Sequence, residues 1–192
     1  SGKLITAFFR NQEIKEAVTE LLEQRDGLMA GICNGFQALI KLGLVPFGKI
    51  MDTDASFPTL TYNKIARHQS KLVRIRIASN NSPWLAATEV GDIYTVPVSH
   101  GEGRFMASPE LLKEMVADGR IITQYVDMAG NATSDIQFNP NGSDWAVEGI
   151  VSPDGRVLGK MGHSERIGAG LYKNVPGRFD MKMFESAVKY FK

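Results

Sequence analysis

The sequence predicts an open α/β sheet, because segments with helical periodicity alternate with short apolar segments along the chain. The apolar runs are too short for helices and suit buried strands. Near the end of the chain, two such runs are joined by Pro-Asp-Gly, which is typical of a β-hairpin. The chain has 192 residues, enough for one domain with a sizeable core, and no repeat or linker divides it.

The first part of the chain predicts two helices around a buried strand. Residues 11–25 carry apolar side chains at amphipathic spacing, after an asparagine N-cap and before a glycine. The run GLMAGI at 27–32 suits a strand, and a second helix is expected over 34–42. The stretch 44–70 contains proline and glycine and is expected to be irregular, with one short strand near 59–62.

The second part predicts three more strands, a hairpin and two helices. Strands are expected at 71–79, 92–100 and 121–126, helices at 108–119 and 179–192, a polar loop at 131–145 and the hairpin at 146–162. Pro97 marks its strand as an edge or a strand end, since proline cannot donate to a ladder. Ser108 and Pro109 are typical of the N-cap and first position of a helix.

Composition excludes several classes of function. The net charge of +1 provides no global field for nucleic acid or an anionic membrane, and there is no apolar stretch of bilayer length. The start, SGKLITAFFRNQE, has no apolar core of the signal-peptide type. A single cysteine cannot form an internal disulfide or a cysteine-rich zinc site. We therefore expect a cytoplasmic protein without a bound metal.

The one cysteine, Cys33, lies in GICNGFQAL between the apolar strand and the second helix. A sharp strand–turn–helix elbow exposes a nucleophile at the carboxyl end of a sheet. The partial positive charge of the helix N-terminus favours a thiolate, so a lowered pKa is expected for Cys33. Gly31 and Gly35 would allow close approach, and the backbone N–H of Asn34 is a candidate oxyanion donor. The alternative is a small buried hydrophobe, which requires none of these features.

A cysteine nucleophile needs a base, and the chain has three histidines. His68, in NKIARHQSK, is expected at the surface. His100 with Glu102, and His163 with Glu165, both form His-x-Glu patterns, in which alternate residues of an extended segment share one face. A carboxylate beside an imidazole can hold its tautomer and stabilise the imidazolium. Sequence chemistry alone does not choose between the two pairs.

Three segments together resemble the class I (triad-type) glutamine amidotransferases. GICNGFQAL resembles the Gly-x-Cys-x-Gly-x-Gln elbow of that family, and GHSER resembles its late His-x-Glu. PVSHGEGRF lies between them, and the match covers nearly the whole chain. We therefore expect a flavodoxin-like open sheet, mostly parallel, with helices on both faces and a late β-hairpin.

The resemblance also implies a role for each residue. Cys33 attacks the side-chain amide carbon of glutamine, His163 passes a proton to the leaving ammonia, and Glu165 orients His163. A glutamyl thioester forms, and water releases glutamate. SHGEGRF is then a glutamine-side or interdomain loop outside the triad. The implied substrate-binding and oxyanion positions are Asn34, Gly35, Gln37, His100 and Glu102.

The resemblance is to members of the family that make formylglycinamidine ribonucleotide in purine synthesis. It implies glutamine as substrate and, as partner, a synthetase domain of the same polypeptide that receives the ammonia. ATP and Mg²⁺ would act in that synthetase part, with no cofactor in this domain. Two alternatives are another cysteine hydrolase of the same architecture and a non-catalytic amidotransferase-like binding module. Glutamine-dependent glutamate release separates the first, and the alkylation rate of Cys33 separates the second.

The sequence departs from the family at its start. Domains of this family begin with a strand and a glycine-rich loop that supplies a second oxyanion N–H, whereas SGKLITAFF resembles the segment just after that loop. The domain at 1–192 is therefore expected to lack its first strand and glycine-rich loop and to belong to a longer polypeptide. We expect such a piece to be a poor glutaminase alone, since losing one oxyanion donor typically costs on the order of 10²–10³ in rate.

Overall fold

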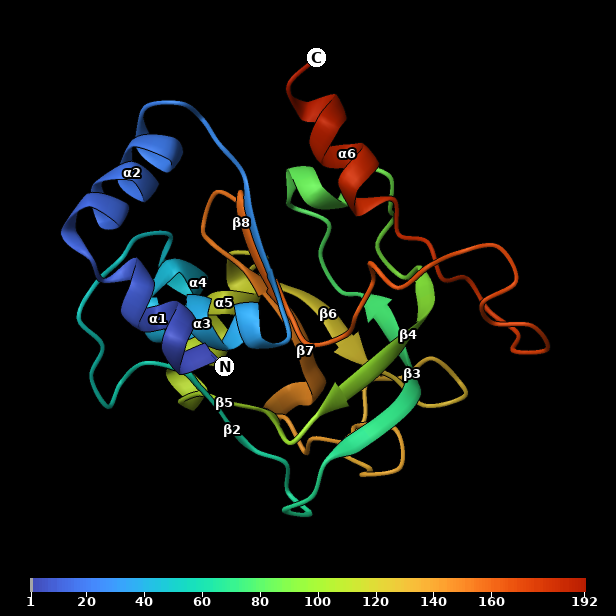
Figure 1. The fold of residues 1–192 in the computed structure, drawn as a ribbon. Helices are drawn as coiled ribbons and strands as arrows, with labels where there is room; N and C mark the ends of the chain where they lie inside the picture. The colour runs from blue at the N-terminus through green and yellow to red at the C-terminus, as the bar shows by residue number, and fades with distance from the viewer. Residues whose placement is uncertain (1) are drawn as a thin grey trace.

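In a computed structural model that describes residues 2–192, the chain forms a six-stranded open sheet and a two-stranded ribbon (Figure 1). The large sheet has the strand order β1-β8-β7-β6-β3-β4. Its strands are β1 Met29–Ile32, β3 Gln69–Ile77, β4 Ile93–His100, β6 Ile121–Tyr125, β7 Val147–Val151 and β8 Val157–Lys160. The ribbon pairs β2, Thr59–Tyr62, with β5, Glu102–Met106.

The α/β class, the open sheet and the late hairpin are confirmed, but the expectation of a mostly parallel sheet is wrong. Within the described residues, β1 and β8 form the one parallel pair, and the other four neighbouring pairs of the large sheet are antiparallel. Parallel neighbours need a long crossover, usually a helix. The link between β3 and β4 holds only the short 3₁₀ turn η1, Pro83–Leu85, among its described elements, so β4 returns antiparallel to β3.

Helices cover both faces of the sheet, as expected. They are α1 Gly2–Phe9, α2 Gln12–Glu23, α3 Asn34–Leu42, α4 Leu44–Phe47, α5 Pro109–Ala117 and α6 Met183–Tyr190. Phe36 of α3 and Met115 of α5 belong to one buried cluster, whereas Met183 of α6 packs with Trp84 and Tyr94 in another. Figure 1 shows α6 well apart from α1 and α3, with the sheet between them. None of the described helices is long and apolar enough to span a membrane.

Several boundaries confirm the sequence predictions, whereas other elements were not predicted. α2, β2 and α5 lie where expected, and the Ser108 hydroxyl accepts the Leu111 N–H at 3.2 Å as the N-cap of α5. β4, which contains Pro97, is the last strand of the sheet order. α6 begins later than predicted, after Lys182 at φ 53°. The helices α1 and α4 and the strand β5 were missed.

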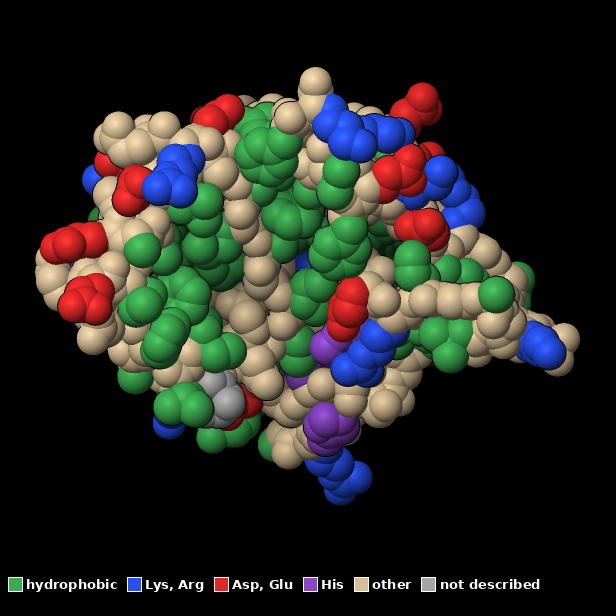
Figure 2. Space-filling view, turned by 45° about the horizontal axis from the view of Figure 1, so that its top comes forward, with side chains coloured by type: hydrophobic (Ala, Val, Ile, Leu, Met, Phe, Trp, Pro, Cys, Tyr) green, Lys and Arg blue, Asp and Glu red, His purple; other side chains and the backbone are tan. Residues whose placement is uncertain are grey.

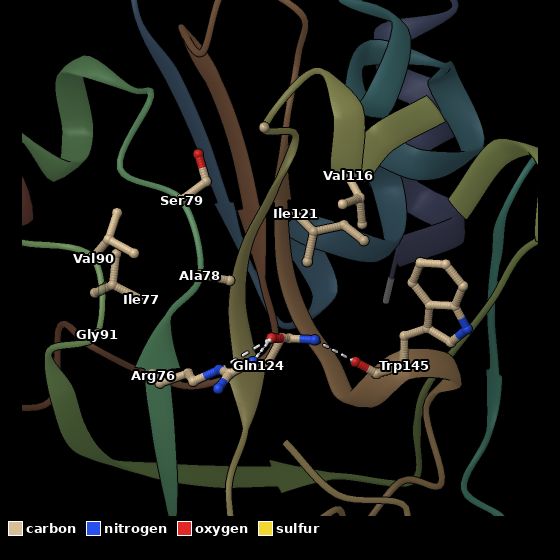
Figure 3. A pocket seen from close by; sticks show the side chains of 11 residues that line it. Arg76, Ile77, Ala78, Ser79, Val90, Gly91, Val116, Ile121, Gln124 and Trp145 are labelled. Carbon is tan, nitrogen blue, oxygen red and sulfur yellow. Dashed lines mark hydrogen bonds between the residues drawn. The ribbon is translucent and has the colours of Figure 1, made fainter. Parts of the chain in front are cut away.

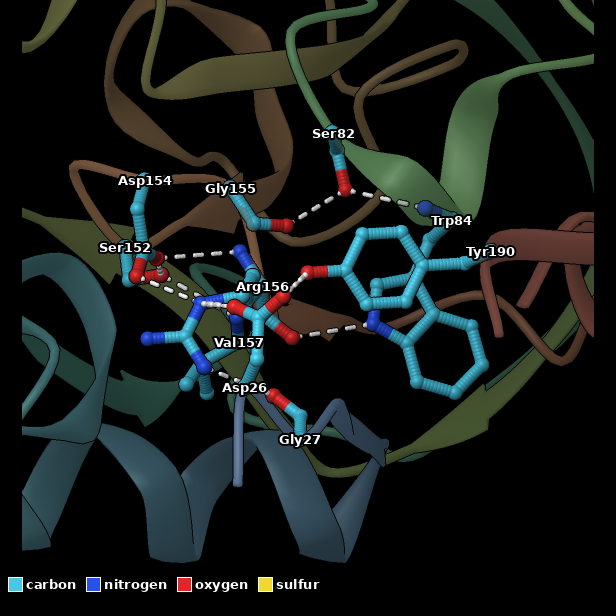
Figure 4. A network of polar contacts seen from close by, with 10 residues as sticks. All are labelled: Asp26, Gly27, Ser82, Trp84, Ser152, Asp154, Gly155, Arg156, Val157 and Tyr190. Atoms are coloured by element: carbon cyan, nitrogen blue, oxygen red, sulfur yellow. Dashed lines mark hydrogen bonds and ion pairs between the residues drawn. The ribbon is translucent and has the colours of Figure 1, made fainter. Parts of the chain in front are cut away.

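The turn of the β7–β8 hairpin is tied to the beginning of β1 (Figure 4). The guanidinium of Arg156 donates to the carboxylate of Asp154 at 2.8 Å and to the carbonyl of Gly27 at 3.1 Å. The indole N–H of Trp84 donates to the Arg156 carbonyl at 3.1 Å. These bonds hold β8 beside β1, and the segments that follow these two strands carry His163 and Cys33.

Candidate active site

Cys33 occupies a sharp elbow between β1 and α3. Its φ of 55° and ψ of −106° lie in a region that non-glycine residues rarely adopt. The Cys33 N–H donates to the carbonyl of Lys160 at 2.9 Å, and its own carbonyl accepts the N–H of Gln37 at 3.1 Å. The predicted strand–turn–helix arrangement is present, and its strained backbone resembles that of nucleophile elbows.

The two glycines beside Cys33 differ in what they allow. A Cβ at Gly31 would lie 2.6 Å from the backbone carbon of Gly35, so only glycine lets β1 pass this close to the start of α3. A Cβ at Gly35 would meet no described atom within 4 Å. The expected close approach therefore applies to Gly31, while Gly35 faces open space beside Asn34.

The thiol of Cys33 is nearly buried, and this changes its expected chemistry. Burial is the largest influence and raises the pKa of Cys33, because a thiolate loses solvation there. A hydrogen bond from the N–H of Asn34 and the charge of Arg166 act in the lowering direction but do not outweigh burial. The prediction of a lowered pKa is therefore wrong. The thiol donates to the carbonyl of Ser99 at 3.9 Å and needs a base to become nucleophilic.

His163 is paired with Glu165 in the loop after β8. The Nδ1 atom of His163 lies 2.6 Å from a carboxylate oxygen of Glu165. Because a carboxylate only accepts, Nδ1 donates this bond, which leaves Nε2 as the acceptor nitrogen of the neutral imidazole. The backbone N–H of His163 donates to the carbonyl of Pro97 at 2.9 Å, and the thiol of Cys33 donates to the carbonyl of Ser99 in the same strand, so the loop and the thiol both lie against the end of β4. The pair has the arrangement that a general base requires.

The other His-x-Glu pair does not form an ion pair. His100 is the last residue of β4 and Glu102 is the first of β5, so they do not lie on one face of a continuous strand, contrary to expectation. His100 is 4% exposed, and neither ring nitrogen has a hydrogen-bond partner among residues 2–192. Burial lowers its pKa to about 4, which keeps the ring neutral. Glu102 instead uses its backbone carbonyl to accept the Gln37 side-chain amide at 2.6 Å.

A cleft of about 680 Å³ opens beside Cys33. Its lining includes all the residues implied for the substrate side except Gly35, namely Asn34, Gln37, His100 and Glu102. Three cationic side chains, Lys3, Lys41 and Arg67, also line it. Figure 2 shows histidine side chains gathered on one face with an acidic and a basic side chain beside them. The volume is within the range of small-molecule sites.

Sequence reasoning missed the part that β4 plays in this site. The carbonyl of Pro97 accepts the His163 N–H at 2.9 Å, and the Ser99 carbonyl accepts the thiol of Cys33. His68 is exposed, as predicted, yet its Nε2 lies 3.0 Å from the Ser99 hydroxyl and it lines the cleft. The end of β4 thus contacts three segments that are distant in sequence. Nothing in a strand pattern reports which carbonyls serve this purpose.

A second hollow, of about 550 Å³, lies over β3 and β6 (Figure 3). Its floor holds Arg76, whose guanidinium donates to the side-chain oxygen of Gln124 at 2.9 Å. Gln124 in turn donates to the carbonyl of Trp145 at 2.8 Å. These polar groups therefore already satisfy one another. No cluster of three metal-ligating side chains occurs in the described part of the chain.

A family model for the CobB/CobQ-like glutamine amidotransferase domain matches residues 1–191. The chain belongs to this family. The chain is 36% identical over 156 residues to the phosphoribosylformylglycinamidine synthase subunit PurQ of Chlorobaculum tepidum, and 35% identical over 164 residues to that of Salinibacter ruber.

These alignments cover 81% and 85% of this amidotransferase chain but 60% and 63% of the two relatives. The chain therefore spans less than two thirds of their length. Among solved structures, PurLQS from Thermotoga maritima is similar with a TM-score of 0.69 and 27% identity, covering 97% of this chain and 72% of that one. The glutaminase domain of Trypanosoma brucei CTPS, at 14% identity and a TM-score of 0.51 over 96% of this chain and 78% of that one, shares the fold.

Proposed function

We propose that this chain is the glutaminase part of a phosphoribosylformylglycinamidine synthase. It hydrolyses glutamine and supplies ammonia for the ATP-dependent conversion of formylglycinamide ribonucleotide to formylglycinamidine ribonucleotide. The observation that carries the proposal is that the strained Cys33 elbow and the His163–Glu165 pair, bonded at 2.6 Å, both form hydrogen bonds to carbonyls at the end of β4. The similarity to PurQ subunits and to PurLQS supports the choice of acceptor and of a synthetase as partner. A reducing cytoplasm would keep Cys33 as a thiol.

The proposed chemistry begins with proton transfer from Cys33 to Nε2 of His163. The sulfur then attacks the side-chain carbonyl carbon of glutamine, and the N–H of Asn34 donates to the oxyanion. The carbon–nitrogen bond breaks as the imidazolium of His163 gives its proton to the leaving ammonia. Water, deprotonated by His163, cleaves the thioester to release glutamate and restore the thiol. Glu165 stabilises the imidazolium throughout.

The cleft supplies complementary groups for free glutamine. Lys3, Lys41 and Arg67 line it and match the α-carboxylate of the substrate. The Gln37 side chain holds the Glu102 carbonyl at 2.6 Å and so fixes the turn that carries the carboxylate of Glu102, which matches the α-ammonium group. We propose that this turn and α3 together recognise the amino-acid end of glutamine.

The test is the Cys33→Ala variant. Glutamate release from glutamine should fall on the order of 10⁴-fold or more, because the nucleophile and its base act as a unit. With the synthetase present, formation of the amidine from added ammonia should remain within a few-fold of wild type. Loss of both activities would show that Cys33 is structural. Hydrolysis of other amides or esters without glutamine would indicate a different cysteine hydrolase.

A further inference from the structure

A fully buried ion pair lies behind the loop that carries His163. The ammonium of Lys160, in β8, is 3.0 Å from a carboxylate oxygen of Glu148, in β7, and both side chains are 0% exposed. The two strands are antiparallel neighbours. Taking two charges out of water is costly unless good geometry and additional hydrogen bonds compensate. The other hydrogen bonds of Lys160 and Glu148 therefore indicate which segments this pair fixes.

Those remaining bonds converge on the two neighbours of His163. The ammonium of Lys160 donates to the carbonyl of Gly162 at 3.0 Å and to the hydroxyl of Ser164 at 2.8 Å. Together with Glu148, these acceptors use all three of its protons. The carboxylate of Glu148 accepts the N–H of Gly162 at 2.6 Å. Both backbone polar groups of Gly162 are thus fixed by the pair.

The second carboxylate oxygen of Glu148 anchors the pair to the sheet. It accepts the hydroxyl proton of Thr123, in β6, at 2.5 Å. The fit around Gly162 is close, because a Cβ there would lie 2.8 Å from Glu148 Oε1 and 2.6 Å from a methyl of Val96. Only a glycine at position 162 therefore allows the loop before His163 to pack directly against the carboxylate of Glu148.

Lys160 also contacts the nucleophile segment through its backbone. Its carbonyl accepts the Cys33 N–H at 2.9 Å, so a single residue is bonded to the elbow and to both neighbours of His163. The two segments are otherwise distant in sequence. Neither charged side chain is exposed to the cleft, so neither touches substrate.

We propose that Lys160 and Glu148 are positioning residues that set the imidazole of His163 relative to the thiol of Cys33. This inference rests on the proposed function, since it assigns the pair to the glutaminase reaction. The rival interpretation is that the pair only stabilises the fold. The two interpretations predict different effects of an apolar replacement. Apolar side chains of similar volume can replace a buried ion pair without loss of stability, but they cannot form hydrogen bonds to the peptide groups of Gly162.

The test is the double variant Lys160→Met with Glu148→Leu in the 192-residue chain. Its melting temperature is compared with that of wild type, and the rate of Cys33 alkylation by iodoacetamide is measured from pH 5 to 10. We expect a folded protein whose alkylation profile moves to higher pH and whose rate at pH 7 falls at least about tenfold, as the imidazole no longer assists. In glutamate release, kcat should fall at least about tenfold with KM within about threefold.

A folded double variant with the wild-type alkylation profile and kcat would overturn the proposal. If the double variant does not fold, Ser164→Ala decides, since it removes one acceptor of Lys160 and leaves the ion pair in place. It should lower kcat by about threefold or more, and an unchanged kcat and profile would contradict us.

Arg120→Met is the matched control. Arg120 is 2% exposed and is paired with Glu114 at 2.7 Å and Asp118 at 2.9 Å, with a further bond to the Pro46 carbonyl. Its loss should lower the melting temperature and leave the alkylation profile unchanged. If wild type releases no glutamate even with the synthetase present, the proposed function fails, whereas the alkylation profiles of the chain still test the positioning of His163.

Discussion

His163 and Glu165 lie in the loop after β8, whereas His100 ends β4 and Glu102 begins β5. Both pairs have one residue between histidine and glutamate. In the first, imidazole and carboxylate are joined at 2.6 Å. In the second, the imidazole is buried without a partner among the described residues, and the glutamate contributes its backbone carbonyl to Gln37.

The difference shows that one His-x-Glu spacing can give two geometries, because the path of the backbone determines whether the two side chains meet. Gly101 lies at a bend between β4 and β5, so His100 and Glu102 belong to two different strands. The loop after β8 instead brings the two side chains of its pair together. The first arrangement places a neutral imidazole in the lining of the cleft, and the second fixes the orientation of an imidazole through its carboxylate partner.

Removing each imidazole in turn should give the largest difference in activity between the two pairs. His163→Ala should lower glutaminase kcat on the order of 10³–10⁴-fold, because triad members act as a unit. His100→Ala should cost about tenfold and act mainly through KM, since this ring lines the cleft. Steady-state glutamate release measures both, with thermal melting to check folding. The reverse ranking would assign the base to His100.

A second prediction uses stability and pH. Burial lowers the pKa of His100 to about 4, from about 6.5 in the unfolded chain, so the unfolded state binds more protons between these values. This contribution to stability is complete above pH 6.5 and is lost as pH falls toward 4, by up to about 3 kcal/mol. Urea unfolding of wild type and His100→Gln at pH 7 and pH 4.5 measures it.

The His100→Gln variant should lose less stability than wild type over that interval. The charges of His68 and Glu148 also act on His100, in opposite directions, and both remain in the variant. Equal losses in the two proteins would mean that His100 is accessible to protons in the folded state. That result would contradict its description as a neutral, buried imidazole.

The smallest effects separate the two glutamates. Glu165→Gln keeps an acceptor for His163 but removes the charge that stabilises the imidazolium, and kcat should fall by about 10²-fold. Glu102→Gln keeps the backbone carbonyl that holds Gln37, so kcat should stay within about threefold, with any change in KM. Progress curves of glutamate release at several glutamine concentrations distinguish the two. Similar losses of kcat would place both carboxylates at the reacting atoms.

Local signals predicted much of this fold. Features that depend on neighbouring residues in the chain were predicted. They are the cap at Ser108, the short strand at 59–62, the Pro-Asp-Gly hairpin and the edge position marked by Pro97. The strand directions could not be obtained in this way, because they depend on which distant segments pair. β5 was missed because its pairing with β2 joins residues at least 40 positions apart.

The sequence predicted several residues that line one cleft, but it did not predict their electrostatics. The elbow at Cys33 has a sequence signature in its glycines, and the structure places Asn34, Gln37, His100 and Glu102 around one cleft. The direction of the Cys33 pKa depends on burial by residues far along the chain, which the helix-terminus argument leaves out. Lys160 stands in an otherwise apolar strand, VLGK, and that was the one visible signal of the buried pair.

Two glycines of the sheet, Gly31 and Gly159, lie beneath α3 and affect the position of the Cys33 sulfur. Gly31 and Gly159 are direct neighbours in the β1–β8 register, and a Cβ at Gly159 would collide with the ring of Phe36. The helix α3 therefore packs directly against the backbone of β1 and β8, and these two strands set its distance from the sheet. A methyl group added at Gly31 or Gly159 would push the first turn of α3 away from the sheet and displace the sulfur of Cys33. The residues of the proposed triad would all remain unchanged.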